Sequence, residues 1–261
     1  MAAPTARQLK DAAALLRRKG RQATGCFQVE GWRSVMSAID AGAVIEHIFV
    51  GPALTVPDDD MVRLADAAPV FRIREREMQQ LSDVTTPPGI LAVVRQPEPA
   101  ARDPWPERVL LLDGVQDPGN VGTLIRTAAW MGIDTVAIGP GTADPFAPKV
   151  VRSTMGGLWD VVLDRVADLT DWLEQATTGG AQIWITDMTG TSLTDWAPST
   201  PSVLVIGSEA QGCSEAVRRA AAGAVSIGRG GVPGAVESLN AAVAGAIIMS
   251  RWAPPVSQPP V

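Results

Sequence analysis

Short, almost continuously apolar runs alternate with helix-like stretches from residue 107 onward. The five runs are RVLLLDG (108–114), DTVAIG (134–139), AQIWIT (181–186), SVLVIG (202–207) and AVSIG (224–228). A strand that is apolar on both faces must be buried on both faces, which is typical of a parallel sheet with helices on each side. The pattern therefore predicts an α/β domain built on a parallel sheet.

A proline-rich segment, QPEPAARDPWP, precedes this region at residues 96–106. Four prolines in eleven residues are incompatible with a helix or a central strand, so the segment indicates a linker. We therefore expect a first domain over residues 1–96, a linker over 97–106 and a second domain over 107–261.

The first domain is also expected to be α/β, because its helical and strand patterns alternate. Helices are predicted at Thr5–Lys19, Gly31–Ala41, directly after Asp58–Asp60, and at Glu75–Leu81. Strands are predicted at Val44–Val50, Val70–Ile73 and Ile90–Arg95.

Composition narrows the possible classes of protein. The chain has 261 residues, of which 46% are hydrophobic, enough for a substantial core. It has no apolar run near the roughly 20 residues of a membrane span, and its first residues lack the apolar stretch of a secretory signal. The cytoplasm is therefore the expected location, with no membrane partner.

The few cysteines and histidines argue against a metal site. Cys26 and Cys213 lie far apart in the sequence, and His47 is the single histidine. These residues show no metal-ligand spacing, so no metal is expected. His47 lies inside the apolar run VIEHIFV, where we expect a structural residue rather than the base of a hydrolase.

The net charge of −6 does not favour nucleic acid as a partner, but the charge is unevenly distributed. The first 21 residues contain one acidic residue and six basic ones: Arg7, Lys10, Arg17, Arg18, Lys19 and Arg21. Either these side chains form a solvated helix face, or they contact phosphate groups and release counterions.

The first candidate motif is LLLDGVQDPGNVGTLIRTAAWMG, which ends one predicted strand and opens a helix. Pro118 suits the first helical turn and Gly132 suits the C-terminal stop. An apolar stripe at helical spacing should pack on the sheet: Val121, Leu124, Ile125 and Ala128. Asn120 falls in the first turn. Arg126 lies off the stripe, where it either covers the helix flank or serves the site.

Two further strand ends carry unusual sequence, and ligands of open α/β sheets bind at such ends. The run 202–207 leads into Gly207, Ser208, Glu209 and Gly212. The run 224–228 leads into a glycine-rich loop, after which 238–240 (Ser-Leu-Asn) opens an alanine-rich helix. A helix start of this kind can hold an anion. Neither segment matches a Walker loop or a dinucleotide fingerprint.

Together the three segments resemble the motifs of the SpoU-type (TrmH-like) RNA ribose 2′-O-methyltransferases of the SPOUT superfamily. The matching residues are Asp117–Gly122 with Arg126–Ala128, then Gly207 with Glu209 and Gly212, then Ser238–Asn240. The stretch 144–156 is similar to the family's segment between the first two motifs. Residues 24–51 and 85–95 look like the auxiliary RNA-binding domain of the ribosomal-RNA branch, which is similar to certain ribosomal proteins.

The resemblance implies a fold, a cofactor and partners. The second domain should carry a C-terminal trefoil knot that wraps S-adenosylmethionine, and the first domain should bind the RNA substrate. A homodimer is implied. Ribosomal RNA is the favoured substrate and transfer RNA is possible.

The resemblance also implies the site residues. The reaction site would comprise Asn120, Arg126, Glu209, Ser238 and Asn240. The cofactor would contact Gly207, Ser208, Gly212, Ile227, Leu239 and Asn240. Two roles for Arg126 are open: it accepts the proton of the ribose hydroxyl, or it stabilises the developing alkoxide while a solvent base takes the proton.

One departure from the family pattern concerns the loop after Ile227. The family usually continues with Ile-Pro-Met, whereas this chain has Gly228–Gly231 and a longer loop, with Pro233 displaced. An RNA-binding protein with an inactive methyltransferase fold is therefore the main alternative. A nucleotide- or NAD-binding enzyme is a weaker one, because the chain lacks the glycine fingerprint and its acidic residue.

Overall fold

The computed structural model describes residues 3–98, 104–231 and 238–253. The chain forms two compact units. The first contains the residues up to Glu98 together with Asp144–Trp159, and the second contains the residues from 99 to Ala143 together with those from Asp160 onward. The segment 144–159 thus packs with the N-terminal unit, although it lies far along the predicted second domain.

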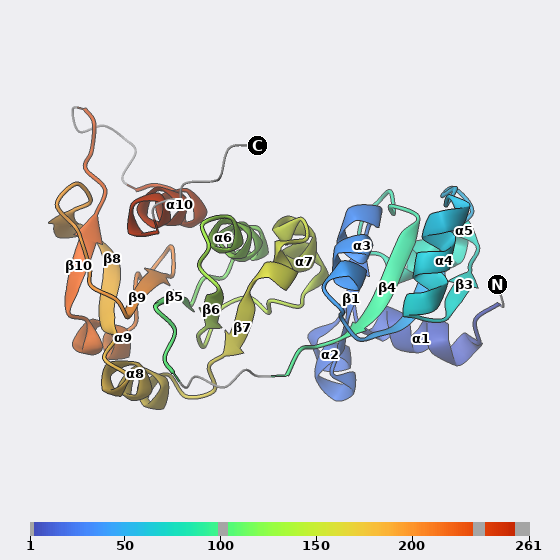
Figure 1. Cartoon of the computed structure of the whole chain (residues 1–261), viewed down its shortest axis with the longest axis horizontal. Coiled ribbons are helices and arrows are strands. Elements are labelled where there is room, and N and C mark those ends of the chain that lie inside the picture. Colours follow the sequence, from blue (N-terminus) through green and yellow to red (C-terminus); the bar gives the residue numbers. More distant parts are fainter. Residues whose placement is uncertain (1–2, 99–103, 232–237, 254–261) are drawn as a thin grey trace. The chain divides into compact units, whose positions relative to one another are not determined.

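The first unit is built on a four-stranded sheet in the order β1-β4-β2-β3 (Figure 1). Its strands are β1 (Cys26–Glu30), β2 (Ile45–Val50), β3 (Val70–Arg72) and β4 (Ile90–Arg95). β4 pairs antiparallel with both β1 and β2, and β2 pairs parallel with β3. The predicted α/β character is confirmed, as are the three predicted strands.

Strand β1 was not predicted, because its sequence CFQVE carries two polar side chains. Both are nevertheless buried. The Gln28 amide donates to the carbonyl oxygens of Ala12 and Leu81, each at 2.9 Å, and Glu30 accepts from Arg152 at 3.0 Å. These partners are distant in sequence, so no local pattern reveals them.

The helices of this unit are α1 (Ala6–Ala14), α2 (Arg18–Thr24), α3 (Trp32–Asp40), α4 (Asp58–Ala67), α5 (Glu75–Leu81) and α7 (Pro148–Thr154). A 3-10 turn at Gly157–Asp160 begins in this unit and ends at the first residue of the next segment. The single helix predicted over Thr5–Lys19 is wrong, since α1 ends at Ala14. A Cβ on Gly20 would lie 2.1 Å from the carbonyl oxygen of Ala14, so the corner between α1 and α2 depends on this glycine.

The second unit is a six-stranded sheet in the order β10-β8-β9-β5-β6-β7, and every neighbouring pair is parallel. Its strands are β5 (Arg108–Asp113), β6 (Thr135–Ile138), β7 (Val162–Arg165), β8 (Gln182–Ser192), β9 (Ser202–Gly207) and β10 (Gly223–Ser226). The predicted parallel sheet is confirmed. Edge strand β7 was missed because VLDR is short and half charged. The knot implied by the resemblance stays a prediction.

Helices cover both faces of this sheet (Figure 1). α6 (Pro118–Trp130) and α10 (Ala241–Trp252) lie together on one face, and α8 (Leu169–Thr178) and α9 (Glu215–Ala220) lie on the other. The predicted apolar stripe of α6 is fully buried. A Cβ on Gly245 would lie 2.4 Å from Leu124 Cδ2, so α10 approaches α6 closely. No helix within the described ranges combines the length and hydropathy of a membrane span.

Candidate active site

Two of the predicted strand ends lie side by side, because Asp113 at the end of β5 pairs with Gly207 at the end of β9. The loop after β5 leads to Asp117, whose Oδ1 accepts from the backbone N–H of Asn120 at 2.8 Å. This capping bond satisfies one of the free amides at the start of α6. The bond also fixes the backbone position from which the Asn120 side chain projects.

Three predicted residues from three distant segments form one chain of hydrogen bonds. The Asn120 amide Nδ2 donates to Glu209 Oε1 at 2.7 Å, and the Asn240 amide Nδ2 donates to Asn120 Oδ1 at 3.0 Å. Asn240 Oδ1 accepts from the backbone amides of Ala242 and Val243 at the start of α10. The motifs at the ends of β5 and β9 and before α10 therefore converge as the sequence predicts.

The direction of this chain follows from its two ends. The Asn240 oxygen is committed to the α10 amides, so its NH₂ group faces Asn120 and requires an acceptor there. Asn120 must then present its own NH₂ group to Glu209, whose ionised carboxylate can only accept. Glu209 thus holds Asn120 in one orientation.

Arg126 is exposed on α6, on the side away from the buried stripe. It forms no hydrogen bond or ion pair with any residue in the described ranges, Glu209 included. The structure therefore places Arg126 on the same helix as Asn120 but outside the amide–carboxylate chain. No residue in the described ranges occupies any of the five donors of its guanidinium.

The loop that carries Glu209 is short and tightly closed. Ser208 and Gly212 exchange two backbone hydrogen bonds, at 3.0 and 2.8 Å, and Gly212 has a φ of +69°. A Cβ on Gly207 would lie 2.4 Å from backbone atoms of Gly212 and Cys213, so only glycine fits there. Buried Asp113 accepts from the Ser214 amide at 2.6 Å and ties the loop to β5. Sequence reasoning missed this role of Asp113.

Cys213, directly behind this loop, is not a nucleophile. Burial, reinforced by the nearby charge of Asp113, raises the pKa of its thiol to about 12. Cys26 in the first unit also has a raised pKa, mainly because of burial. Both thiols therefore stay protonated near neutral pH, and a covalent mechanism through cysteine is disfavoured.

The residues expected to hold the cofactor lie on the segments that follow the strand ends. Ile227 directly follows β10 and is half-buried, whereas Leu239 is 48% exposed one residue before the cap of α10. Ser238 is exposed beside it. An exposed apolar side chain such as Leu239 suits the face of a flat aromatic group such as adenine. Residues 228–231 of the divergent loop are exposed, and 232–237 fall outside the described ranges.

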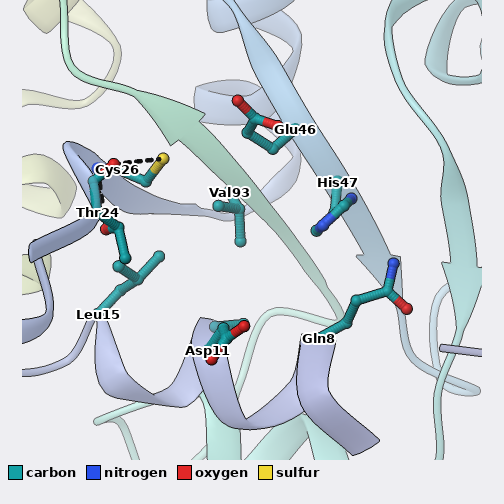
Figure 2. Close-up of a pocket in the computed structure, with 9 residues that line it drawn as sticks. Gln8, Asp11, Leu15, Thr24, Cys26, Glu46, His47 and Val93 are labelled. Carbon is teal, nitrogen blue, oxygen red and sulfur yellow. Dashed lines mark hydrogen bonds between the residues drawn. The ribbon is translucent and has the colours of Figure 1, made fainter. Parts of the chain in front are cut away.

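A cavity of about 180 Å³ lies elsewhere, within the first unit (Figure 2). It is enclosed by α1 and the sheet, with Asp11, Cys26, Glu46 and His47 among its lining residues. The ring of His47 contacts Phe49 and Phe71 edge-on, in keeping with the structural role predicted for it. None of the predicted catalytic or cofactor residues lines this cavity.

Comparison with protein families agrees with the three converging motifs. Residues 107–250 match the model of the SpoU rRNA methylase family. The chain belongs to this family. Residues 6–92 match a second model, the MRM3-like substrate-binding domain, which covers most of the N-terminal segment of the first unit. The family resemblance stated from the sequence is confirmed.

Similar proteins cover nearly the whole chain. The 23S rRNA (guanosine(2553)-2′-O)-methyltransferase RlmP of Bacillus subtilis is 31% identical, over 93% of this chain and 94% of its own length. The SpoU methyltransferase AviRb of Streptomyces viridochromogenes, solved with AdoMet, is 28% identical with a TM-score of 0.83, covering 95% of this chain and 97% of its own. An AdoMet-bound rRNA methyltransferase from Sinorhizobium meliloti is also 28% identical, with a TM-score of 0.84 and coverage of 96% and 95%.

Proposed function

We propose that this chain transfers a methyl group from S-adenosylmethionine to the 2′-hydroxyl of a ribose in ribosomal RNA. The observation that carries the proposal is the hydrogen-bonded chain Glu209–Asn120–Asn240, which brings the three motifs of the family to one edge of the parallel sheet. The named activities of RlmP and of the AdoMet-bound relatives support the same reaction.

When bound, S-adenosylmethionine supplies a methyl group on a positively charged sulfonium, so the leaving group needs no acid. Gly207, Ser208, Gly212, Ile227, Leu239 and Asn240 would hold it. The remaining difficulty is the weakly acidic hydroxyl, which must lose its proton as it attacks. The protein residues therefore have to orient the hydroxyl and manage its proton.

We propose that Arg126 is the residue that interacts with the ribose 2′-hydroxyl. Because it has no protein partner in the described ranges, its guanidinium is available to the ribose oxygen and the adjacent phosphate. It either stabilises the developing alkoxide or accepts the proton in a crowded site. Asn120, held by Glu209 and Asn240, orients the substrate beside it, and Ser238 completes the pocket.

The first unit is proposed to bind RNA through the turn between α1 and α2. Arg17, the N-cap of α2, and Arg18 and Lys19 in its first turn are exposed in three successive positions. Such a cluster suits phosphate groups, whose neutralisation releases counterions. Arg21 does not belong to this surface, because its side chain is buried. For Arg21, the two interpretations of the basic residues, a solvated helix face or a contact with phosphate groups, are therefore both wrong.

A homodimer is proposed through the outer side of α6 and α10. Three large apolar side chains are exposed on these helices: Trp130 at 83%, Val243 at 49% and Ile247 at 37%. Exposed apolar groups of this size indicate an interaction surface. Light scattering should give twice the mass of one chain, and Trp130→Glu should reduce it. A monomeric wild type would contradict the proposal.

The cytoplasmic location expected from the sequence stays a prediction.

The reaction is tested by incubating the chain with methyl-labelled S-adenosylmethionine and unmodified ribosomal RNA or transfer RNA, then digesting to nucleosides. Label in 2′-O-methylribose from ribosomal RNA is expected. Label on a base, or in transfer RNA alone, would contradict the proposal. Calorimetry with the cofactor separates the inactive alternative, which predicts RNA binding without methyl transfer.

A further inference from the structure

The loop that leads to Asn120 is braced by a second loop, the one between β6 and α7. Gly139 N donates to Leu112 O at 2.8 Å, and Ala143 N donates to Val115 O at 2.9 Å. The two loops approach so closely that a Cβ on Gly141 would lie 3.6 Å from the Cα of Gly114. The loop that presents the first motif is thus supported by residues outside any motif.

Thr142 makes the connection that a backbone group could not make. Its hydroxyl donates to Leu112 O at 2.7 Å and accepts from Gly114 N at 3.0 Å. A hydroxyl can donate and accept at once, whereas an amide N–H or a carbonyl does only one. The Thr142 hydroxyl therefore joins Leu112, near the end of strand β5, to the backbone amide of Gly114, the first residue of the loop.

These two bonds control the direction in which the chain leaves the sheet. Gly114 has a φ of +76°, a left-handed conformation in which the loop turns toward α6. Three residues later Asp117 caps α6 and holds the amide of Asn120. A change at Gly114 therefore moves the start of α6 and, with it, the Asn120 side chain relative to Glu209.

We propose that Thr142 is a positioning residue for methyl transfer, acting through the Gly114–Asp117 loop on Asn120. The proposal rests on the proposed function. Thr142 does not touch the reacting atoms; its hydroxyl keeps Asn120 and Glu209 in register with the ribose. Misplacement by about 1 Å can cost roughly a hundredfold in rate, so loss of the hydroxyl should lower kcat more than it raises KM.

The test compares Thr142→Val with Thr142→Ser and with a matched control, Thr177→Val. Thr177 is exposed on α8, and its hydroxyl also donates to a backbone carbonyl, Leu173 O at 2.8 Å, but on the opposite face of the sheet. Valine keeps the shape of threonine and removes the hydroxyl. Methyl transfer, cofactor binding by calorimetry and Tm are measured for each full-length variant.

We expect Thr142→Val to lower kcat about ten- to a hundredfold, with the affinity for S-adenosylmethionine changed less than threefold. Thr142→Ser should restore most of kcat, and Thr177→Val should keep it at a similar Tm. Full activity of Thr142→Val, or failure of serine to restore it, would overturn the inference. A wild-type chain without methyl transfer would instead overturn the proposed function.

Discussion

Helices α2 and α6 each carry an arginine that the sequence singles out. In the structure one of these side chains is buried and the other is exposed. Arg21 on α2 is 3% exposed. Its Nε and Nη2 donate to Asp144 Oδ2 at 3.0 and 2.7 Å, and its Nη1 donates to Leu15 O at 2.7 Å. Arg126 on α6 is exposed, without a partner in the described ranges.

The difference separates an arginine that stabilises the fold from one that is available for chemistry. A buried guanidinium is tolerated only when its donors are satisfied, so Arg21 cannot turn to a ligand without losing those bonds. An exposed guanidinium keeps its water and costs the fold little, so it can exchange water for substrate. Substitutions at the two positions should therefore affect different quantities.

The largest effect is expected for Arg126→Ala. Methyl transfer should fall by about a hundred- to a thousandfold, the scale found when a preorganised donor to a developing oxyanion is removed. The Tm and the affinity for S-adenosylmethionine should stay close to wild type, because the side chain supports no described contact. Labelled-methyl assays, calorimetry and thermal unfolding measure the three. Simultaneous loss of cofactor binding would contradict the catalytic assignment.

Arg21→Ala should instead lower the free energy of unfolding by about 3 kcal/mol, because it leaves the largely covered carboxylate of Asp144, 12% exposed, without its cation. Urea unfolding measures this loss. Arg17→Ala is the matched control, since it removes an exposed arginine four residues earlier and should change stability by less than about 0.5 kcal/mol. If the two variants were equally stable, the structural role of Arg21 would be refuted.

Replacing Arg17, Arg18 and Lys19 together with alanine tests the surface beside Arg21. The affinity for RNA should fall, and the slope of log K against log salt should flatten by about two to three units if all three side chains contact phosphates. Filter binding at several salt concentrations measures the slope. Arg219→Ala removes an exposed cation from α9 and should leave it unchanged. An unaltered slope in the triple variant would make this cluster a solvated face.

The smallest effect is expected at Glu30, whose carboxyl group is buried. Burial raises the pKa of Glu30 despite its bond to Arg152. The folded state therefore holds this proton more tightly than the unfolded state does, so stability from Glu30 is present at low pH and is lost as pH rises above its ordinary value of 4.5.

Glu30→Gln should remove this pH dependence. Relative to wild type, the variant should become more stable by up to about 1 kcal/mol between pH 5 and pH 7. Urea unfolding at both values measures the difference. If the variant instead became less stable relative to wild type as the pH rose from 5 to 7, the bond to Arg152 would outweigh the burial of Glu30.

Much of the second unit could be predicted because its signals are local. The buried stripe of α6, its start at Pro118 and the left-handed Gly132 after its end all follow from spacing along one helix. The meeting of Asn120 with Glu209 and Asn240 could be expected as well, since the carboxyl ends of parallel strands share one edge of the sheet.

The first unit was less predictable because its polar residues are satisfied at long range. Gln28 made β1 look unlike a buried strand, although its partners Ala12 and Leu81 make burial possible. Arg21 seemed part of a basic surface, although Asp144 lies 123 residues away in sequence. Thr142 carried no signal, because its role depends on a loop that precedes it by nearly thirty residues.

The sequence by itself determined the parallel sheet, the family and the residues that meet at its edge, because apolar periodicity and motif spacing are written along the chain. Only the tertiary structure decided which polar groups pair: that Glu209 holds Asn120 and not Arg126, that Arg21 is buried, and that the Thr142 hydroxyl braces Gly114. The physical reason is that a hydrogen bond depends on the position and direction of both partners, and folding sets these through contacts between distant segments.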